Sequence, residues 1–278
     1  MNLMPADKPQ DVYSHVLAQV KVLMDEDRAN GHPLAELLLP HITRKVVKQT
    51  VMTSVYGVTF VGAREQVMRQ LVDLREINWP DPKERALYQA SMYIARLTLN
   101  SLSTVFTGAK SIMGWLGECA SLMAREQQPV SWVTPLGLPV TQPYRKNSAY
   151  TIRTLMQNVT MTDNNDSLPV SVTRQKAAFP PNFVHSLDAT HMMTTAIECE
   201  KKGLNFSSVH DSFWAHACDV DTMNTVLREQ FIQLYSQPIL DDLHTSFSIR
   251  FPHVQFPPVP KRGTLDLNKI RESKYFFS

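Results

Sequence analysis

The chain reads Arg44-Lys-Val-Val-Lys-Gln-Thr-Val-Met-Thr-Ser-Val-Tyr-Gly57 in the stretch that decides its fold. Arg44, Lys48, Met52 and Tyr56 recur every four residues, so on a helix they form one slowly turning row. Val47, Val51 and Val55 form an apolar row beside it that suits a hydrophobic core. We therefore expect an amphipathic helix that ends near Gly57, where a glycine favours helix termination.

The row combines two cations, a thioether and a phenol along about three helical turns. Cations can hold the phosphates of a nucleoside triphosphate, and an aromatic ring at the far end can meet its sugar and base. A plain amphipathic helix with a basic exposed side is the alternative, and the spacing alone does not choose between the two.

The composition indicates a globular protein with a substantial core, in one large domain or two: 278 residues, 43% hydrophobic and 19% charged. A net charge of +2 is too small to imply a nucleic-acid partner by itself. Cys119, Cys199 and Cys218 have no paired spacing, which argues against a disulfide scaffold and a structural zinc site and suits a reducing compartment.

No apolar run is long enough to span a bilayer, and residues 1–10 do not resemble a signal peptide, so we expect no membrane association. Glycine is scarce and forms no phosphate-binding loop. Bound phosphates would therefore be held by side chains and metal.

Hydrophobic periodicity predicts a mainly α fold with a small antiparallel β element, an α+β class. The predicted helices cover 12–30, a segment opening at 33, 43–57, 64–75, 83–125, 185–202 and 221–236. The sixth is expected to begin after Pro180-Pro181, because proline interrupts helices. A hairpin is predicted at 132–140, an extended hairpin or loop at 142–166, and two strands within 204–217.

His210-Asp211 lies between two β-prone segments, which predicts a tight turn between strands. A carboxylate at such a turn is well placed to hold Mg²⁺ against phosphate oxygens. The alternative is an ordinary turn aspartate that accepts hydrogen bonds from its own backbone.

His185, Asp188 and His191 suggest a metal triad, but helical geometry argues against one. Residues six apart lie roughly 120° from each other around a helix, so the two histidines do not converge. We expect His185 to face a groove and the other two residues to be structural.

These motifs occur in register with Asn182-Phe-Val-His-Ser186, and together they resemble the single-subunit DNA-directed RNA polymerases of bacteriophages and mitochondria. The resemblance is closest to the mitochondrial branch, through residues 44–53, 55–58 and 185–193 and the terminal Tyr-Phe-Phe-Ser. It covers nearly the whole chain, from about residue 2 to residue 278.

The resemblance implies the fingers and partial palm of a right-hand polymerase. Residues 1–184 correspond to a fingers region that contains the nucleotide-binding helix 43–57 and the hairpin or loop 132–166. Residues 185–278 correspond to the C-terminal half of the palm, with the His-Asp turn at 209–212 and a C-terminal foot at 261–278.

The resemblance also implies roles for the row and its end, which make up a nucleotide-binding site of Arg44, Lys48, Met52, Tyr56 and Gly57. Arg44 and Lys48 would grip the triphosphate, and Lys48 would donate a proton to the departing pyrophosphate. Met52 would pack near the nascent base pair, and Tyr56 would help to select ribonucleotides.

By the same resemblance Asp211 binds catalytic Mg²⁺, His210 lies near the primer terminus, and His185 contacts the template–product duplex. Residues 142–166 correspond to a hairpin that reads promoter DNA in the phage enzymes, whereas the mitochondrial branch relies on initiation factors. The implied partners are a DNA template, the RNA product, ribonucleoside triphosphates and mitochondrial transcription initiation factors. The implied location is the mitochondrial matrix.

One departure from the family matters most. Two-metal phosphoryl transfer needs carboxylates from two strands. The family's first aspartate lies upstream of the fingers, and Asp7, Asp11, Asp25 and Asp27 lack its sequence surroundings. We therefore expect the C-terminal part of a polymerase that requires the upstream part and is inactive alone.

Three rival interpretations remain. A family A DNA polymerase shares the row and the turn, but usually has glutamate where Ser212 stands and often phenylalanine where Tyr56 stands. A non-catalytic nucleic-acid-binding or regulatory fragment would explain the missing carboxylate. An α-helical scaffold with coincidental motifs would require three registered matches by chance.

Overall fold

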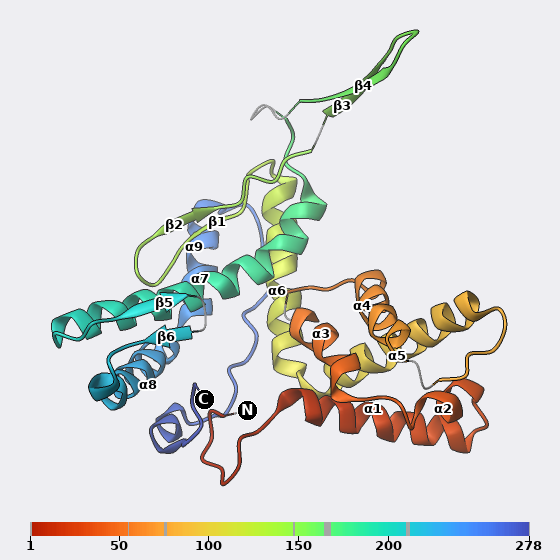
Figure 1. The fold of residues 1–278 in the computed structure, drawn as a ribbon. Coiled ribbons are helices and arrows are strands. Elements are labelled where there is room, and N and C mark those ends of the chain that lie inside the picture. The colour runs from red at the N-terminus through yellow and green to blue at the C-terminus, as the bar shows by residue number, and fades with distance from the viewer. Residues whose placement is uncertain are drawn as a thin grey trace. The chain divides into compact units, whose positions relative to one another are not determined.

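The computed structural model describes residues 2–54, 56–74, 77–146, 148–163, 168–209 and 212–277. The chain forms two compact units, Met1–Ser111 together with Ser273–Ser278, and Ile112–Glu272. Helices dominate both units, and the strands form antiparallel pairs (Figure 1), which confirms the predicted mainly α class. The predicted functional division at 184/185 falls inside one helix of the second unit, so it does not coincide with this structural division and stays a prediction.

Among the described residues, five helices lie wholly within the first unit. They are α1 (Val12–Ala29), α2 (Pro33–Leu38), α3 (Arg44–Ser54), α4 (Phe60–Val72) and α5 (Lys83–Val105). The long helix α5 contacts all four others, so it is the central element of the unit.

The core of the first unit consists of aliphatic side chains repeated at helical spacing. Helix α1 buries one side along its length, and α3, α4 and α5 do the same. Apolar burial of this kind stabilises a helix far more than its intrinsic propensity. The fully buried members include Val16, Val20, Met24, Val47, Val67, Leu71 and Ile94.

The two ends of the chain meet within the first unit. The Ser273 hydroxyl donates to the carbonyl oxygen of Asn2 at 2.5 Å, and the Tyr275 hydroxyl donates to that of Asp7 at 3.0 Å. The C-terminal residues are therefore held by the segment that precedes α1.

The second unit contains the remaining helices and all the described strands. Helix α6 (Thr107–Arg125) begins in the first unit and continues into the second. The strands are β1 (Ser131–Val133), β2 (Pro139–Thr141), β3 (Ser148–Arg153), β4 (Asn158–Asp163), β5 (Ser207–Val209) and β6 (Ser212–Trp214). The other helices are α7 (Val172–Lys201), α8 (Val220–Ser236) and α9 (Ile239–Arg250), with 3-10 turns η1 (Ala217–Asp219) and η2 (Leu267–Glu272).

Helix α7 corrects one sequence-based expectation. It was predicted to begin after Pro180-Pro181, but it begins at Val172 and runs through both prolines. A proline inside a helix removes a hydrogen bond and normally breaks or kinks it. Here Phe179, Pro180 and Phe183 are buried in the core, so packing on both sides of the pair overrides the local preference.

Aromatic rings dominate the core of the second unit. Phe179 on α7 lies against Trp132, Phe183 and Phe247, with ring centroids 5.2, 5.8 and 6.1 Å away. Offset and edge contacts of this kind add stabilisation beyond the buried area. They bring α7, α9 and the β1–β2 hairpin together around one centre.

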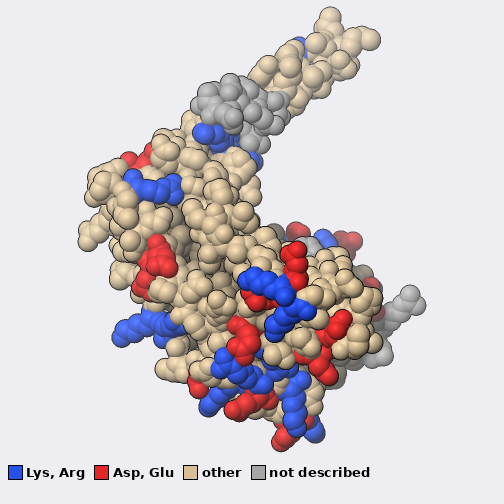
Figure 2. All heavy atoms as spheres, turned by 90° about the vertical axis from the view of Figure 1, so that its left-hand side faces the viewer, with Lys and Arg blue, Asp and Glu red and all other residues tan. Residues whose placement is uncertain are grey.

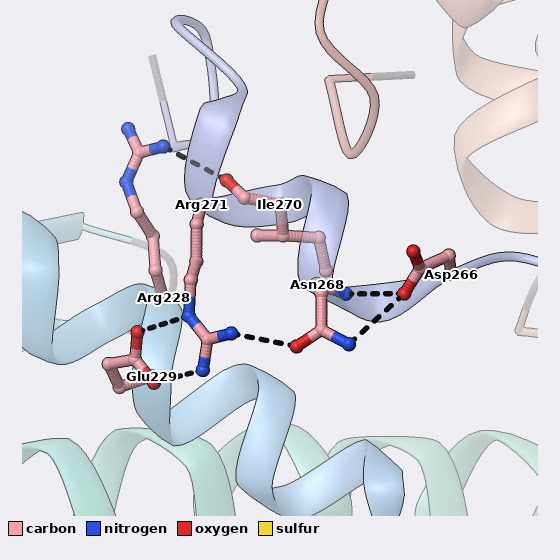
Figure 3. Close-up of polar contacts among 6 residues, drawn as sticks. All are labelled: Arg228, Glu229, Asp266, Asn268, Ile270 and Arg271. Carbon is pink, nitrogen blue, oxygen red and sulfur yellow. Dashed lines mark hydrogen bonds and ion pairs between the residues drawn. The ribbon is translucent and has the colours of Figure 1, made fainter.

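A polar clamp fastens η2 to α8 (Figure 3). Arg271 donates two hydrogen bonds to the carboxylate of Glu229, Nε to Oε1 at 2.6 Å and Nη2 to Oε2 at 2.8 Å. It donates a third to Asn268 Oδ1 at 2.7 Å, and Arg228 donates to the carbonyl oxygen of Ile270 at 3.1 Å. The side chain of Ile270 is fully buried, so apolar packing and the clamp hold the same short turn.

We expect Arg271→Lys to loosen η2, because lysine keeps the charge but cannot make the paired bonds to Glu229. Amide hydrogen exchange across residues 267–272 should become several-fold faster. The free energy of unfolding should change little, because the pair is exposed to solvent. Lys269→Ala removes an exposed cation from the same turn and serves as the control. Unchanged exchange in Arg271→Lys would show that packing alone holds η2.

Candidate nucleotide-binding helix and catalytic turn

The predicted amphipathic helix is present as α3, with one buried apolar side and one exposed side, as expected. Val47 and Val51 are buried, together with Val46 and Thr50, on the side that faces the core. Val55, the last residue of the predicted apolar row, lies outside the described residues. Burial of this side leaves the row of four functional candidates on the opposite, solvent-facing side.

All four candidates are exposed. Arg44 and Lys48 lie on the first two turns, and Met52 and Tyr56 are 47% and 44% exposed. The helix ends at Ser54, so Tyr56 continues the row from the following turn. Gly57 closes that turn with φ at +72°, a left-handed conformation that glycine adopts without strain.

Arg44 forms the main ion pair of this surface. Its Nε donates to Asp11 Oδ2 at 2.5 Å and its Nη2 to Asp11 Oδ1 at 3.3 Å. Asp11 also caps α1, where it accepts hydrogen bonds from the Tyr13 amide and the Ser14 hydroxyl. These hydrogen bonds, chiefly that from Arg44, lower the pKa of Asp11 to about 2, and the carboxylate in turn raises the pKa of Arg44.

Tyr13 aligns the two cations of the row. The ring centroid of Tyr13 lies 4.9 Å from Arg44 Cζ and 6.0 Å from Lys48 Nζ. Cations at such distances are attracted by the electron-rich face of the ring. One aromatic ring on α1 therefore supports both positive charges of α3.

The predicted His-Asp turn falls between two paired strands. Strands β5 and β6 pair antiparallel with Val209 opposite Ser212, as the sequence predicted. His210 and Asp211 themselves lie outside the described residues. The strands thus confirm the β segments on both sides of the pair, while the metal-binding role of Asp211 stays a prediction.

His191 anchors β6 to the helices behind it. Its Nε2 lies 2.9 Å from the carbonyl oxygen of Leu227 on α8, and its ring makes edge contacts with Phe231 and Phe213. The side chain is buried, and this burial lowers the pKa of the imidazole. His191 is therefore structural, as expected.

His185 is exposed near the middle of α7, on a different side of the helix from the buried His191. Within the described ranges no group of three His, Cys, Asp or Glu side chains is placed to hold a metal ion. The triad interpretation is therefore not supported for the described residues.

Among the helices that the structure describes, none is both long and apolar enough to cross a bilayer.

The second unit also carries an exposed two-stranded ribbon, β3–β4, at the predicted position. Tyr150 pairs with Met161 and Ile152 with Val159, so these four exposed side chains share one side of the ribbon. Leu155 at its turn is fully exposed. Little charge is visible on the projecting ribbon in Figure 2, in contrast to the mixed charges elsewhere on that face.

Sequence reasoning missed Asp11 and Tyr13 as parts of the α3 surface. Asp11 was considered only as a metal ligand, although its position before an apolar helical run is typical of an N-cap. The pairing with Arg44 spans 33 residues. No local pattern could have indicated it.

The depressed pKa of Asp11 makes a testable contribution to stability. Because the folded pKa of about 2 lies below the ordinary value of 3.8, the stabilisation is present above pH 4 and is lost as the pH falls toward 2. We expect Asp11→Asn to lower the melting temperature at pH 5. The difference in melting temperature between the variant and the unmodified chain should become smaller as the pH falls to 2. Asp25→Asn, which removes the exposed carboxylate paired with Arg28 on the same helix, is the control. A difference that does not change between pH 5 and pH 2 would contradict the assignment.

Comparison with known proteins identifies the relationship. A family model described as DNA-dependent RNA polymerase matches residues 1–254 and 249–278. DNA-directed RNA polymerase 1B, mitochondrial, from Nicotiana tabacum is 50% identical over 284 residues, which cover 100% of this chain and 28% of that protein. DNA-directed RNA polymerase 3, chloroplastic, from Nicotiana sylvestris gives the same identity and the same coverage.

The chain thus spans 28% of the length of these two relatives. A shorter relative, DNA-directed RNA polymerase 2A from Nicotiana tabacum, is 49% identical over 285 residues, with 100% of this chain and 84% of that protein covered. The relatives named here include both mitochondrial and chloroplastic proteins. The chain belongs to the DNA-dependent RNA polymerase family of the single-subunit, phage and organellar type.

Proposed function

We propose that this chain supplies the nucleotide-binding helix and one metal-binding carboxylate of an organellar DNA-directed RNA polymerase. The complete enzyme would transfer ribonucleotides to an RNA end under the direction of a DNA template. The observation that carries the proposal is the exposed row on α3, held in place by a buried valine side and by contacts from α1. Membership of the polymerase family supports the reaction class.

Arg44 and Lys48 would bind the triphosphate. The pair with Asp11 uses Nε and Nη2 of a guanidinium that has five N–H donors, so Arg44 can hold Asp11 and a phosphate together. Lys48 would donate a proton to the departing pyrophosphate. This places a neutralising charge where the leaving group develops negative charge.

Met52 and Tyr56 would meet the sugar and base end of the same nucleotide, with Gly57 allowing the turn that presents the phenol. The assignment follows the order of the row, in which the two cations on α3 precede the phenol on the turn after it. A phenolic hydroxyl can exchange hydrogen bonds with a ribose 2′-hydroxyl, which deoxyribose lacks.

Mg²⁺ would be held by Asp211, whose carboxylate is a ligand type that Mg²⁺ prefers. The ion would neutralise charge on the transferred phosphate. Two ions need carboxylates from two strands, and these 278 residues provide only one at the family position. The donor set therefore fits half of a two-metal site, and the upstream part of a polymerase would supply the other half.

His185 on α7 and His210 beside Asp211 would contact the template and product strands. DNA template, RNA product and ribonucleoside triphosphates follow from this function as partners. Transcription initiation factors and a mitochondrial location also belong to the proposal. The location rests on relatives whose printed names include both mitochondrial and chloroplastic proteins. The initiation factors rest only on the resemblance to the mitochondrial branch.

A second candidate is a non-catalytic fragment that binds nucleic acid and competes with a complete polymerase. The feature in its favour is that these 278 residues supply one carboxylate, Asp211, at the family's metal-binding positions. Ser212 after the aspartate and a tyrosine at position 56 argue against a family A DNA polymerase.

Primer extension tests whether these residues contain a complete active site. With an RNA primer, a DNA template, Mg²⁺ and ribonucleotides, we expect no extension by the folded chain alone, because one carboxylate cannot hold both ions. Extension that is lost in Asp211→Asn would show a complete site within these residues and would overturn the half-site proposal.

Nucleotide binding tests α3 directly and does not require turnover. We expect Lys48→Ala to weaken binding of ATP by about tenfold, the usual scale for losing one charge-assisted phosphate contact. Lys45→Ala is the matched control, since Lys45 is exposed on the same helix outside the row, roughly 60° from Lys48 around the helix axis. Equal effects of the two variants, measured by calorimetric titration, would mean that only the general basic charge of α3 matters.

A further inference from the structure

A buried amide sits at the base of the β3–β4 ribbon. Gln175, on the first turn of α7, is fully buried and uses both ends of its amide. Its Nε2 donates to the carbonyl oxygens of Gln142 at 3.0 Å and Tyr144 at 3.2 Å. Its Oε1 accepts from Gln142 Nε2 at 2.7 Å and from the Val130 amide at 3.3 Å.

The amide chain continues along α7. Gln142 is 2% exposed, and its Oε1 accepts a hydrogen bond from Asn182 Nδ2 at 2.9 Å. Gln175 and Asn182 lie two turns apart on the same helix, so they grip Gln142 from two points. The three side chains form a connected network from α7 to the residue that follows β2.

The network holds the stem from which the ribbon leaves the unit. In this stem the Lys146 amide donates to the carbonyl oxygen of Pro169 at 2.8 Å, and the Ser171 amide donates to that of Tyr144 at 3.1 Å. The carbonyl oxygen of Tyr144 therefore accepts hydrogen bonds both from the returning chain and from Gln175.

Apolar packing alone would not set the direction of this stem. The neighbouring core is aromatic, with Trp132 and Phe179 in contact, and dispersion and burial are only weakly directional. Hydrogen bonds to a buried amide are directional, and leaving their partners unsatisfied is costly. Four bonds to one side chain therefore define a single path for the stem.

We propose that Gln175, with Gln142 and Asn182, is a positioning residue that fixes, relative to α7, the stem of the ribbon, which consists of residues 142–146 and 168–171. Because His185 lies on the same helix, the network also fixes the stem relative to His185. A duplex template that contacts both then meets one preset surface. This consequence for nucleic acid rests on the proposed function, whereas the fixed path of the stem does not.

Pulsed electron paramagnetic resonance on the full 278-residue chain tests the fixed direction. Spin labels are attached at Lys146→Cys in the stem and Ile197→Cys on α7, both exposed, in a Cys218→Ser background because Cys119 and Cys199 are buried. We expect one narrow distance distribution in this labelled chain. Gln175→Met, which keeps the length but loses all four bonds, should at least double its width.

Two controls separate positioning from general stability. Gln128→Met makes the same chemical change at an exposed site of the same unit, and Phe247→Leu weakens the core without touching an amide. Both should leave the distribution narrow. If Gln175→Met fails to fold, Asn182→Ala, which is partly exposed and removes fewer bonds, takes its place. An unchanged width in the folded variant would overturn the proposal.

Binding measurements test the consequence for nucleic acid. We expect Gln175→Met to weaken binding of a short DNA duplex by about tenfold and to leave ATP binding to α3 unchanged. A broadened distance distribution with unchanged duplex affinity would refute the link to template binding. If the unmodified chain binds no duplex, the proposed function fails for this surface, while the distance measurement still decides whether Gln175 positions the stem.

Discussion

Burial of the valine side of α3 is the interaction on which the candidate nucleotide site depends. Val46, Val47 and Val51 pack into the core of the first unit, where α3 contacts α1, α4 and α5. A helix fixed on one side presents its other side in a defined order. The row from Arg44 to Tyr56 therefore follows from hydrophobic burial, and the chemistry of the site follows from the row.

Polar and cation–π contacts set the positions of side chains and loops that hydrophobic burial alone leaves undefined. Tyr13 and Asp11 come from the start of α1 and hold the charged groups of α3 without covering them. In the second unit Gln175 holds the ribbon stem in a similar way, by hydrogen bonds to its backbone carbonyl oxygens. Both cases place a directional contact at the edge of an apolar core, where packing alone would leave a long side chain or a loop free to move.

Much of the fold could be predicted from the sequence, because most helices carry a clear apolar period. Helices α1 and α3 begin and end close to the predicted residues, and the three strand pairs lie where turn and β-prone residues indicated. The predicted helical stretch 83–125 is divided, because Phe106 has a non-helical backbone conformation that ends α5 before α6 begins. The start of α7 could not be predicted, since the buried surroundings of Phe179 and Phe183 outweigh the local effect of Pro180-Pro181. Helix α9 was also not predicted, and its apolar period is weak.

The candidate site was predictable where it depends on local spacing, and not where it depends on contacts between distant residues. The spacing of Arg44, Lys48, Met52 and Tyr56 indicated a shared exposed side, and the structure confirms it. Contacts between residues distant in sequence, such as Asp11 with Arg44 and Gln142 with Gln175, leave no local pattern. They become visible only when the helices are packed.

The central claim is that these residues form half of a polymerase active site. The most direct measurement is complementation, in which the chain is mixed with the upstream part of a related polymerase and RNA extension is followed on a DNA template. The account predicts extension only when both polypeptides are present, and none when the chain carries Asp211→Asn. A stable complex that still fails to extend RNA, or extension by the upstream part alone, would contradict it.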